Sequence, residues 1–361
     1  MNRGPSRREI VTSIGPVQTE RRWWASQCPC VPGGFHADGL LGIEGSLSPL
    51  LLEKLCYLAA DVSFNKTREH VASMLGVALA AETVRTYCEA KASEVARRQE
   101  TETDSADRFQ KVEGQWEFAV DAGKVNTLEE GWRDLKIAVA QKRPAGEAAT
   151  PQEWQSRQLP AATARVMWAE IATSKRFRRS WKSRLKRLGL KVMADLHVLG
   201  DGASWIWNSA DRALTGCRQT LDIDHACEHI ADAGKKLFGE ATPASTAFFE
   251  RGRSLLLAEG WPGICRLVGE EYQRADTPAI RKILEAMTRY FASHLSRLNY
   301  SECLASGQAI GSGVVEGAAK TLGLRLKARG ARWKHKNVRP MAALVCVRNS
   351  PDWSKIWKTA A

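Results

Sequence analysis

A change from helical to strand patterns after residue 112 is the feature that most limits how this chain can fold. The segment QWEFAVDAG places Trp116, Phe118 and Val120 at every second position and ends on Asp121. KVNT and WRDLKIAVAQKR follow it and predict two more strands of a meander. LKVMADLHVLG, which leads into Asp201, and RQTLDID predict two later strands. Strands that alternate with helices in this way define the α/β class and a mixed sheet.

Helical patterns precede and interrupt these strands. Ser48 and Pro49 have the residue types of a helix start, and Gly76 predicts the end of the next helix. The tight connection after that glycine is equally typical of a helix-turn-helix and of a plain helical hairpin. A long helix is expected from about Ala161 to Leu188, and residues 243 to 300 predict an all-helical insertion.

Net charge points to a polyanionic partner. The 361 residues include 53 Lys and Arg against 40 Asp and Glu, a formal charge of +13, which favours nucleic acid first and an anionic membrane second. No apolar run reaches the roughly 18 residues of a membrane-spanning helix, and no signal peptide is evident, so an intracellular protein is expected. The odd count of nine cysteines favours reduced thiols, and Cys28 and Cys30 lack the spacing of a zinc knuckle.

Three carboxylates far apart in sequence fall at ends of predicted elements: Asp121, Asp201 and Glu316. A charge at the end of an apolar strand must be solvated, paired or metal-bound. Oxygen donors suit Mg²⁺ or Mn²⁺, and two such ions about 4 Å apart support phosphodiester chemistry. Two plainer interpretations stay open: Asp121 as a turn residue before Gly123, and Glu316 as a complement to a helix N-terminus.

In order and spacing, five motifs resemble those of DDE insertion-sequence transposases of the ISKra type, which are related to the Mutator-like superfamily. They are VDAGKVNT, GWRDLKIAVAQKR, LGDGASWIWN, LDIDHACEHI and IGSGVVEGAAKTLGLRLKARGARW, and the resemblance runs from about Ser48 to the C-terminus. It implies that Asp121, Asp201 and Glu316 are the catalytic acids and the ligands of two Mg²⁺ (or Mn²⁺) ions. Asp222 and His225 match the Asp/Cys-x-x-His signature and are expected to support that site.

The chain departs from the family at two places. The first acid stands in Asp121-Ala122-Gly123 where relatives have Asp-Gly, and only Cys28-Pro29-Cys30 stands where relatives often have a zinc ribbon. The implied fold is a ribonuclease-H-like mixed sheet with an all-helical insertion, preceded by a small helical domain. The expected regions are a poorly ordered or short-stranded leader (1–47), a helix-turn-helix-like DNA-binding domain (48–100), the first part of the catalytic core (112–238), the helical insertion (239–305) and the C-terminal part of the core (306–361).

The implied activity is Mg²⁺-dependent cleavage of DNA at terminal inverted repeats and transfer of the cut strand into target DNA. A homodimer or higher synaptic oligomer in a prokaryotic cytoplasm, associated with the nucleoid and not with a membrane, is expected. Two alternatives stay open: a truncated or domesticated DNA-binding relative without strand transfer, and a metal-dependent nuclease.

Basic residues near the acids are the expected DNA contacts. The segment from Lys175 to Lys191 contains no acidic residue, and more cations follow Glu316. The predicted contacts are Lys175, Arg176, Arg178, Arg179, Lys182, Lys320, Arg325, Lys327, Arg329 and Arg332. Trp333 either stacks on an unpaired base or packs in the core. His225 and His229 lie one helical turn apart, and orientation by hydrogen bonds is favoured over zinc binding.

Overall fold

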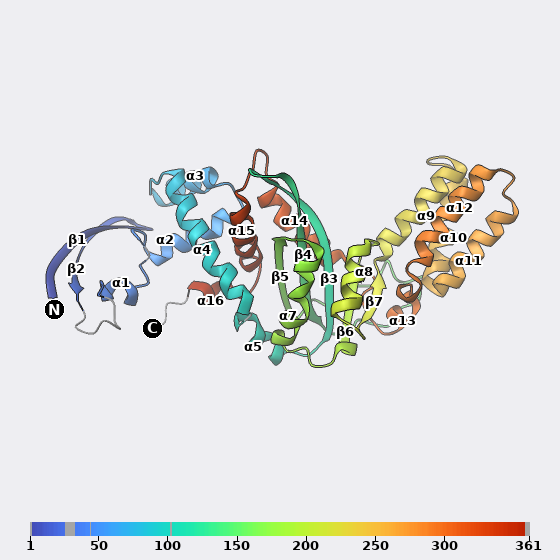
Figure 1. Cartoon of the computed structure of the whole chain (residues 1–361), viewed down its shortest axis with the longest axis horizontal. Helices are drawn as coiled ribbons and strands as arrows, with labels where there is room; N and C mark the ends of the chain where they lie inside the picture. Colours follow the sequence, from blue (N-terminus) through green and yellow to red (C-terminus); the bar gives the residue numbers. More distant parts are fainter. Residues whose placement is uncertain (1, 26–32, 44, 102, 358–361) are drawn as a thin grey trace.

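The structure, a computed structural model, describes residues 2–25, 33–43, 45–101 and 103–357. Cys28 and Cys30 lie outside these ranges, so the prediction about zinc there is not addressed. The molecule is elongated, with a strand hairpin at one end, a mixed sheet in the middle and a helical bundle at the other end (Figure 1). None of the helices in the described ranges has the length and apolar character needed to cross a bilayer.

Five strands form the central sheet in the order β5-β4-β3-β6-β7. β3, β4 and β5 are antiparallel neighbours, whereas β6 and β7 continue from β3 in parallel. Val120 pairs with Gly200, so Asp121 and Asp201 occupy the next positions on neighbouring strands. The α/β class is therefore confirmed. The strands are Gln115–Thr127 (β3), Gly131–Arg143 (β4), Ala164–Ile171 (β5), Leu196–Gly200 (β6) and Arg218–Leu221 (β7).

Side chains of β3 point alternately to the two faces of the sheet and contribute to a separate core on each face. Phe118 and Val120 join the first core, whose helices are Ser174–Arg179 (α6), Trp181–Leu188 (α7) and Ser204–Ala213 (α8). Ala119 and Val125 join the second core, whose helices include Gly313–Leu326 (α14) and His335–Arg348 (α15). Because side chains alternate along a strand, Asp121 points to the face that α14 covers.

The N-terminal region differs from the loosely ordered or short-stranded leader that was expected. Asn2–Thr12 (β1) and Gly15–Trp24 (β2) form a long antiparallel hairpin, followed by the short helix His36–Leu40 (α1). The helix start at Ser48 is confirmed, since its hydroxyl accepts the Leu51 N–H at 3.4 Å. The stop at Gly76 is also confirmed by its left-handed φ of 67°. The helices are Pro49–Ala59 (α2), Phe64–Leu75 (α3), Ala81–Thr101 (α4) and Thr103–Lys111 (α5).

The helices predicted within residues 243 to 300 are confirmed. They form a bundle with α9, which begins at the edge of the sheet directly after β7 (Figure 1). The elements are Ile223–Phe238 (α9), Pro243–Glu259 (α10), Trp261–Gln273 (α11), Pro278–Ala292 (α12) and Tyr300–Ala305 (α13). The remaining pieces are Trp353–Trp357 (α16) and two 3-10 turns, Met193–Asp195 and Leu295–Arg297.

Three details of the predicted strands and helices are wrong. The expected helix from Ala161 to Leu188 is instead β5 followed by the two short helices α6 and α7. KVNT is not a separate strand, because β3 runs on to Thr127 and Asp121 therefore lies inside β3. The strand before Asp201 is shorter than expected and begins at Leu196.

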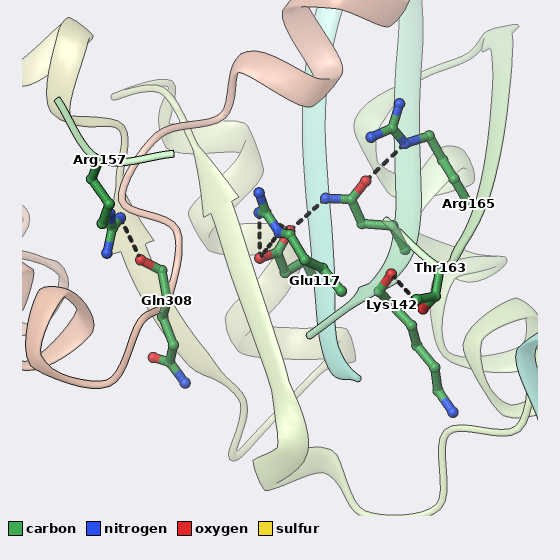
Figure 2. A network of polar contacts seen from close by, with 8 residues as sticks. Glu117, Lys142, Arg157, Thr163, Arg165 and Gln308 are labelled. Carbon is green, nitrogen blue, oxygen red and sulfur yellow. Dashed lines mark hydrogen bonds and ion pairs between the residues drawn. The ribbon is translucent and has the colours of Figure 1, made fainter. Parts of the chain in front are cut away.

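A polar network reinforces the pairing of β5 with β4 (Figure 2). Glu117 of β3 is buried and accepts a hydrogen bond from Arg143 Nε of β4 at 3.1 Å. It also accepts a hydrogen bond from the Gln141 amide nitrogen of β4 at 2.5 Å. The Gln141 amide oxygen in turn accepts a hydrogen bond from Arg165 Nε of β5 at 2.8 Å. These contacts tie three neighbouring strands together at the end of the sheet away from Asp121, and Arg165 can take part because it lies on a strand beside β4.

Candidate active site

Asp121 and Asp201 stand side by side where β3 and β6 pair. Burial raises the pKa of Asp121, and the nearby Asp201 carboxylate raises it further. Asp121 Oδ1 accepts the Ala122 N–H at 2.6 Å, and Asp201 Oδ1 accepts the Ala203 N–H at 2.8 Å. Two carboxylates this close repel each other in their charged forms, so a cation between them would be favourable.

Glu316 approaches the same region from α14. Burial raises the pKa of Glu316, and the charge of Asp222 adds to that effect. A positive charge on His225 would lower the pKa of both Glu316 and Asp121, so His225 lies near both carboxyl groups. Ser312 occupies the N-cap position of α14, but its hydroxyl donates to Glu316 Oε1 at 3.4 Å and does not cap the helix.

A divalent cation such as Mg²⁺ needs oxygen ligands from this site. Across the described ranges, no three or more His, Cys, Asp or Glu side chains are grouped closely enough to hold a metal ion. Mg²⁺ in enzymes is often bound by only one or two carboxylates, with water and phosphate filling the other positions. The pair Asp121 and Asp201 fits that requirement, whereas the carboxylates whose charges act on Glu316 are those of Asp222 and Asp224.

Asp222 fixes the position of the Glu316 helix. Its side chain is fully buried, accepts the His225 N–H at 2.9 Å at the start of α9, and accepts the Ser312 backbone N–H at the start of α14. Its own N–H donates to the Gly200 carbonyl of β6 at 2.8 Å. One carboxylate thus joins the sheet to the first turns of both helices, and Asp222 acts on the site through their positions.

The two histidines of α9 have different neighbours. His225 Nδ1 lies 3.3 Å from Glu228 Oε2, whereas the His229 ring stacks on Tyr290 with centroids 3.5 Å apart. Burial lowers the pKa of His229. His225 therefore has a polar partner, which agrees with the hydrogen-bonding alternative to a zinc site, whereas His229 is held by ring stacking.

Lys136 and Tyr290 are two residues near the acids that the sequence did not single out. Lys136 is a buried lysine of β4 whose ammonium lies 3.9 Å from the Trp205 ring and whose charge lowers the pKa of Asp121. Lys136 could have been identified from the sequence, because a lysine within an apolar strand segment is unusual. Tyr290 comes from α12, and its proximity to Asp201 depends on how the insertion packs.

A groove of about 500 Å³ leads from Asp121 along the far half of α14. Lys320 of α14 and Lys327, which directly follows this helix, are exposed along it, and Lys124 of β3 lines its other side. Lys124 is paired with Asp134 at 2.5 Å, so Lys320 and Lys327 are the principal cations there. Arg329 and Arg332 are exposed just beyond the end of α14.

The basic segment after residue 174 lies elsewhere. α6 and α7 are held by Phe177 and Trp181 in the first core, on the opposite face of the sheet from Asp121. The two groups of predicted DNA contacts therefore do not form one continuous track. Four of the predicted contacts on this segment are exposed and one, Arg178, is half-buried; the exposed ones are Lys175, Arg176, Arg179 and Lys182.

The prediction that Arg325 contacts DNA is wrong. Its side chain is 3% exposed, its Nε donates to the Ala59 carbonyl at 2.6 Å, and its guanidinium lies 4.7 Å from the Trp333 ring. It is therefore not available to DNA. Trp333 is 5% exposed and donates from Nε1 to the Leu326 carbonyl at 3.0 Å, so of its two predicted roles core packing is the one observed.

Comparison with known proteins adds no family assignment. A scan against protein-family models finds no match, and a search of curated proteins finds no relative.

Proposed function

We propose that this chain is a DNA transposase of the DDE type, which cleaves at transposon ends and joins the freed 3′-hydroxyl to target DNA. The observation that carries the proposal is the juxtaposition of Asp121 and Asp201 on neighbouring parallel strands, on the sheet face that α14 and Glu316 cover. The strand order and the helical insertion between β7 and α14 support the ribonuclease-H-like core that the sequence resemblance implies.

Each part of the site has a defined task in this reaction. Mg²⁺ or Mn²⁺ ions supply activation of the attacking hydroxyl and charge stabilisation at the phosphate. Asp121 and Asp201 would hold one ion, and Glu316 would complete the ligand set from α14. Asp222 keeps the first turn of α14 against the sheet and thereby determines where Glu316 lies.

DNA is the proposed partner along two surfaces. Lys320 and Lys327 would bind phosphates that lead into the carboxylate pair. The short connection from α3 to α4 after Gly76 supports a helix-turn-helix-like role, in which α4, the second helix, would lie in the DNA major groove. A homodimer or higher synaptic oligomer, acting at the nucleoid in the cytoplasm, completes the proposal.

A strand-transfer assay tests this function. The full chain is incubated with labelled DNA that carries the inverted repeats flanking its gene, a supercoiled target plasmid and Mg²⁺. Labelled plasmid is the expected product. Cleavage without joining would indicate a nuclease, and a mobility shift without cleavage would indicate a DNA-binding relative.

Matched variants tie the activity to the site. Asp201→Ala and Glu316→Ala are expected to abolish cleavage and joining while DNA binding persists. Asp195→Ala is the control, because Asp195 is an exposed aspartate just before β6, at its other end. Strand transfer by either of the first two variants at the wild-type rate would refute the assignment.

A further inference from the structure

The helical insertion delivers one side chain to the carboxylate pair. Tyr290, near the end of α12, stacks on His229 of α9 with ring centroids 3.5 Å apart. The His294 ring meets it edge-on at 5.1 Å, and Phe291 meets it edge-on at 5.2 Å. The ring is therefore held between α9 and the end of α12, and its hydroxyl has a fixed direction.

The Tyr290 hydroxyl lies directly over the residue that follows Asp201. A Cβ built on Gly202 would lie 2.6 Å from that oxygen, which is closer than real Cβ contacts allow. Gly202 does not have a positive φ, so the glycine is required here for space and not for backbone conformation. Any side chain at position 202 would displace the tyrosine.

In the described part of the chain, the Tyr290 hydroxyl is buried and has no hydrogen-bond partner. A buried hydroxyl without a partner costs about 1–3 kcal/mol. Burial raises the pKa of Tyr290, and the charge of Asp201 raises it further, so the group is an O–H donor at neutral pH. The position therefore calls for an acceptor.

Asp201 is the acceptor best placed to receive this bond. The other two nearby carboxylates are Asp222 and Glu228. Both oxygens of Asp222 already accept backbone N–H groups, and Glu228 lies against His225. Asp201 accepts only the Ala203 N–H, on Oδ1, among the described residues, so its other oxygen can still accept a hydrogen bond.

We propose that Tyr290 is a positioning residue for Asp201: its hydroxyl donates to the free oxygen of that carboxylate when the site holds a divalent cation. The inference rests on the proposed function, in which Asp201 is a metal ligand. It makes the helical insertion part of the catalytic machinery, because packing of α12 on α9 decides how the second acid is oriented. Hydrogen bonds to metal-binding side chains commonly act in this way.

Mn²⁺ affinity of the full chain, measured by calorimetric titration without DNA, tests the proposal. Tyr290→Phe is expected to weaken binding by about 10- to 100-fold. The same variant in metal-free buffer is expected to resist urea as well as the wild type or slightly better, because it loses only an unpaired hydroxyl and keeps the ring stack. Tyr272→Phe is the control, since Tyr272 is an exposed tyrosine of α11 in the same insertion, and no change is expected.

Gly202→Ala provides a second route to the same result. Its methyl group would push the tyrosine hydroxyl away, so Mn²⁺ affinity is expected to fall as it does in Tyr290→Phe. Wild-type Mn²⁺ affinity in both variants would overturn the role of Tyr290 and leave the proposed function standing. A wild-type chain that binds no Mn²⁺ either alone or with transposon-end DNA would overturn both proposals.

Discussion

At the scale of single residues, Asp222 shows how one buried carboxylate places a site that it does not enter. Its two oxygens accept backbone N–H groups from the first turns of α9 and α14, where the helix dipoles also favour a negative charge. The resemblance identified this residue as a supporting one. The structure supplies the physical task, which is to hold two helix starts against the end of β6.

Asp222→Ala is expected to lower the free energy of unfolding by about 3 kcal/mol, because two buried N–H groups lose a charged acceptor. Urea unfolding monitored by circular dichroism measures the loss. Asp224→Ala is the control, since Asp224 is an exposed acid of the same helix turn, and a change below about 1 kcal/mol is expected. Similar losses in the two variants would show that Asp222 acts only as a first-turn charge.

His197 predicts a pH dependence of stability. Burial, helped by the charge of Arg218, lowers the pKa of His197 to about 3, and its Nε2 lies 2.7 Å from Thr220 Oγ1. The unfolded chain takes up this proton near pH 6.5 and the folded chain does not, so stability is complete above pH 6.5 and falls as the pH drops towards 3. Between pH 7 and pH 5 this histidine accounts for a loss of about 2 kcal/mol.

His197→Gln is the test of that dependence, because the amide can still bond Thr220 but does not titrate. Urea unfolding at pH 7 and pH 5 is expected to show a smaller loss in this variant, by about 2 kcal/mol, than in the wild type. Equal losses would place the titration elsewhere, for example on His294, whose pKa burial lowers to about 4.

At the scale of elements, the sequence predicted the helices and strands that residues close together in the chain determine. β3 and β4 contain apolar-rich segments whose buried positions form continuous runs, and the ends of α2 and α3 follow from Ser48 and Gly76, so these elements were found. β5 was mistaken for a helix because its identity depends on pairing with β4 and on the Glu117 network across three strands. Within the segment itself only a short alternation, with Ala164, Val166 and Trp168 buried, is typical of a strand.

The same distinction applies to the candidate site. Asp121 and Asp201 could be predicted because each follows a recognisable apolar strand segment. Tyr290 could not, because it reaches Asp201 only through the packing of α12 on α9. Arg325 was misplaced because a basic sequence alone does not tell an exposed face of α14 from the buried one.

α14 carries a prediction of its own, since its exposed and buried cations differ in role. Lys320→Gln combined with Lys327→Gln is expected to reduce the slope of log affinity against log salt by about 2, from two lost phosphate contacts. Binding of a duplex about one helical turn long is measured by fluorescence anisotropy. Such a duplex is a stiff, straight rod and does not bend around from one face of the sheet to the other.

Lys175→Gln combined with Lys182→Gln is the matched control, because these exposed lysines lie on the opposite face, on α6 and α7. With the short duplex, this variant is expected to keep a slope close to the wild-type value. The same slope in both double variants would show that DNA does not follow the α14 groove.

At the scale of the whole molecule, the two cores join both helical regions to the sheet. The first core runs from Phe118 of β3 to Leu256 of α10 and Phe291 of α12. The second runs from Val125 of β3 to Leu51 of α2. Although Figure 1 shows the insertion projecting from one end, its apolar contacts with the sheet are continuous. The helical regions predicted as separate domains, 48–100 and 239–305, therefore share cores with the central sheet.

This continuity predicts that the insertion and the sheet unfold together. Phe291→Ala empties a fully buried position of the shared core and is expected to lower the unfolding free energy by about 3–5 kcal/mol. Native-state hydrogen exchange is expected to show that loss equally in α11 and in β3, whereas the control Leu324→Ala, at an exposed position of α14, changes neither. Faster exchange in α11 with β3 unchanged would make the insertion an independent unit. In that case docking of α12 could be lost while the sheet stays folded, and the orientation of Asp201 would depend on an equilibrium separate from global stability.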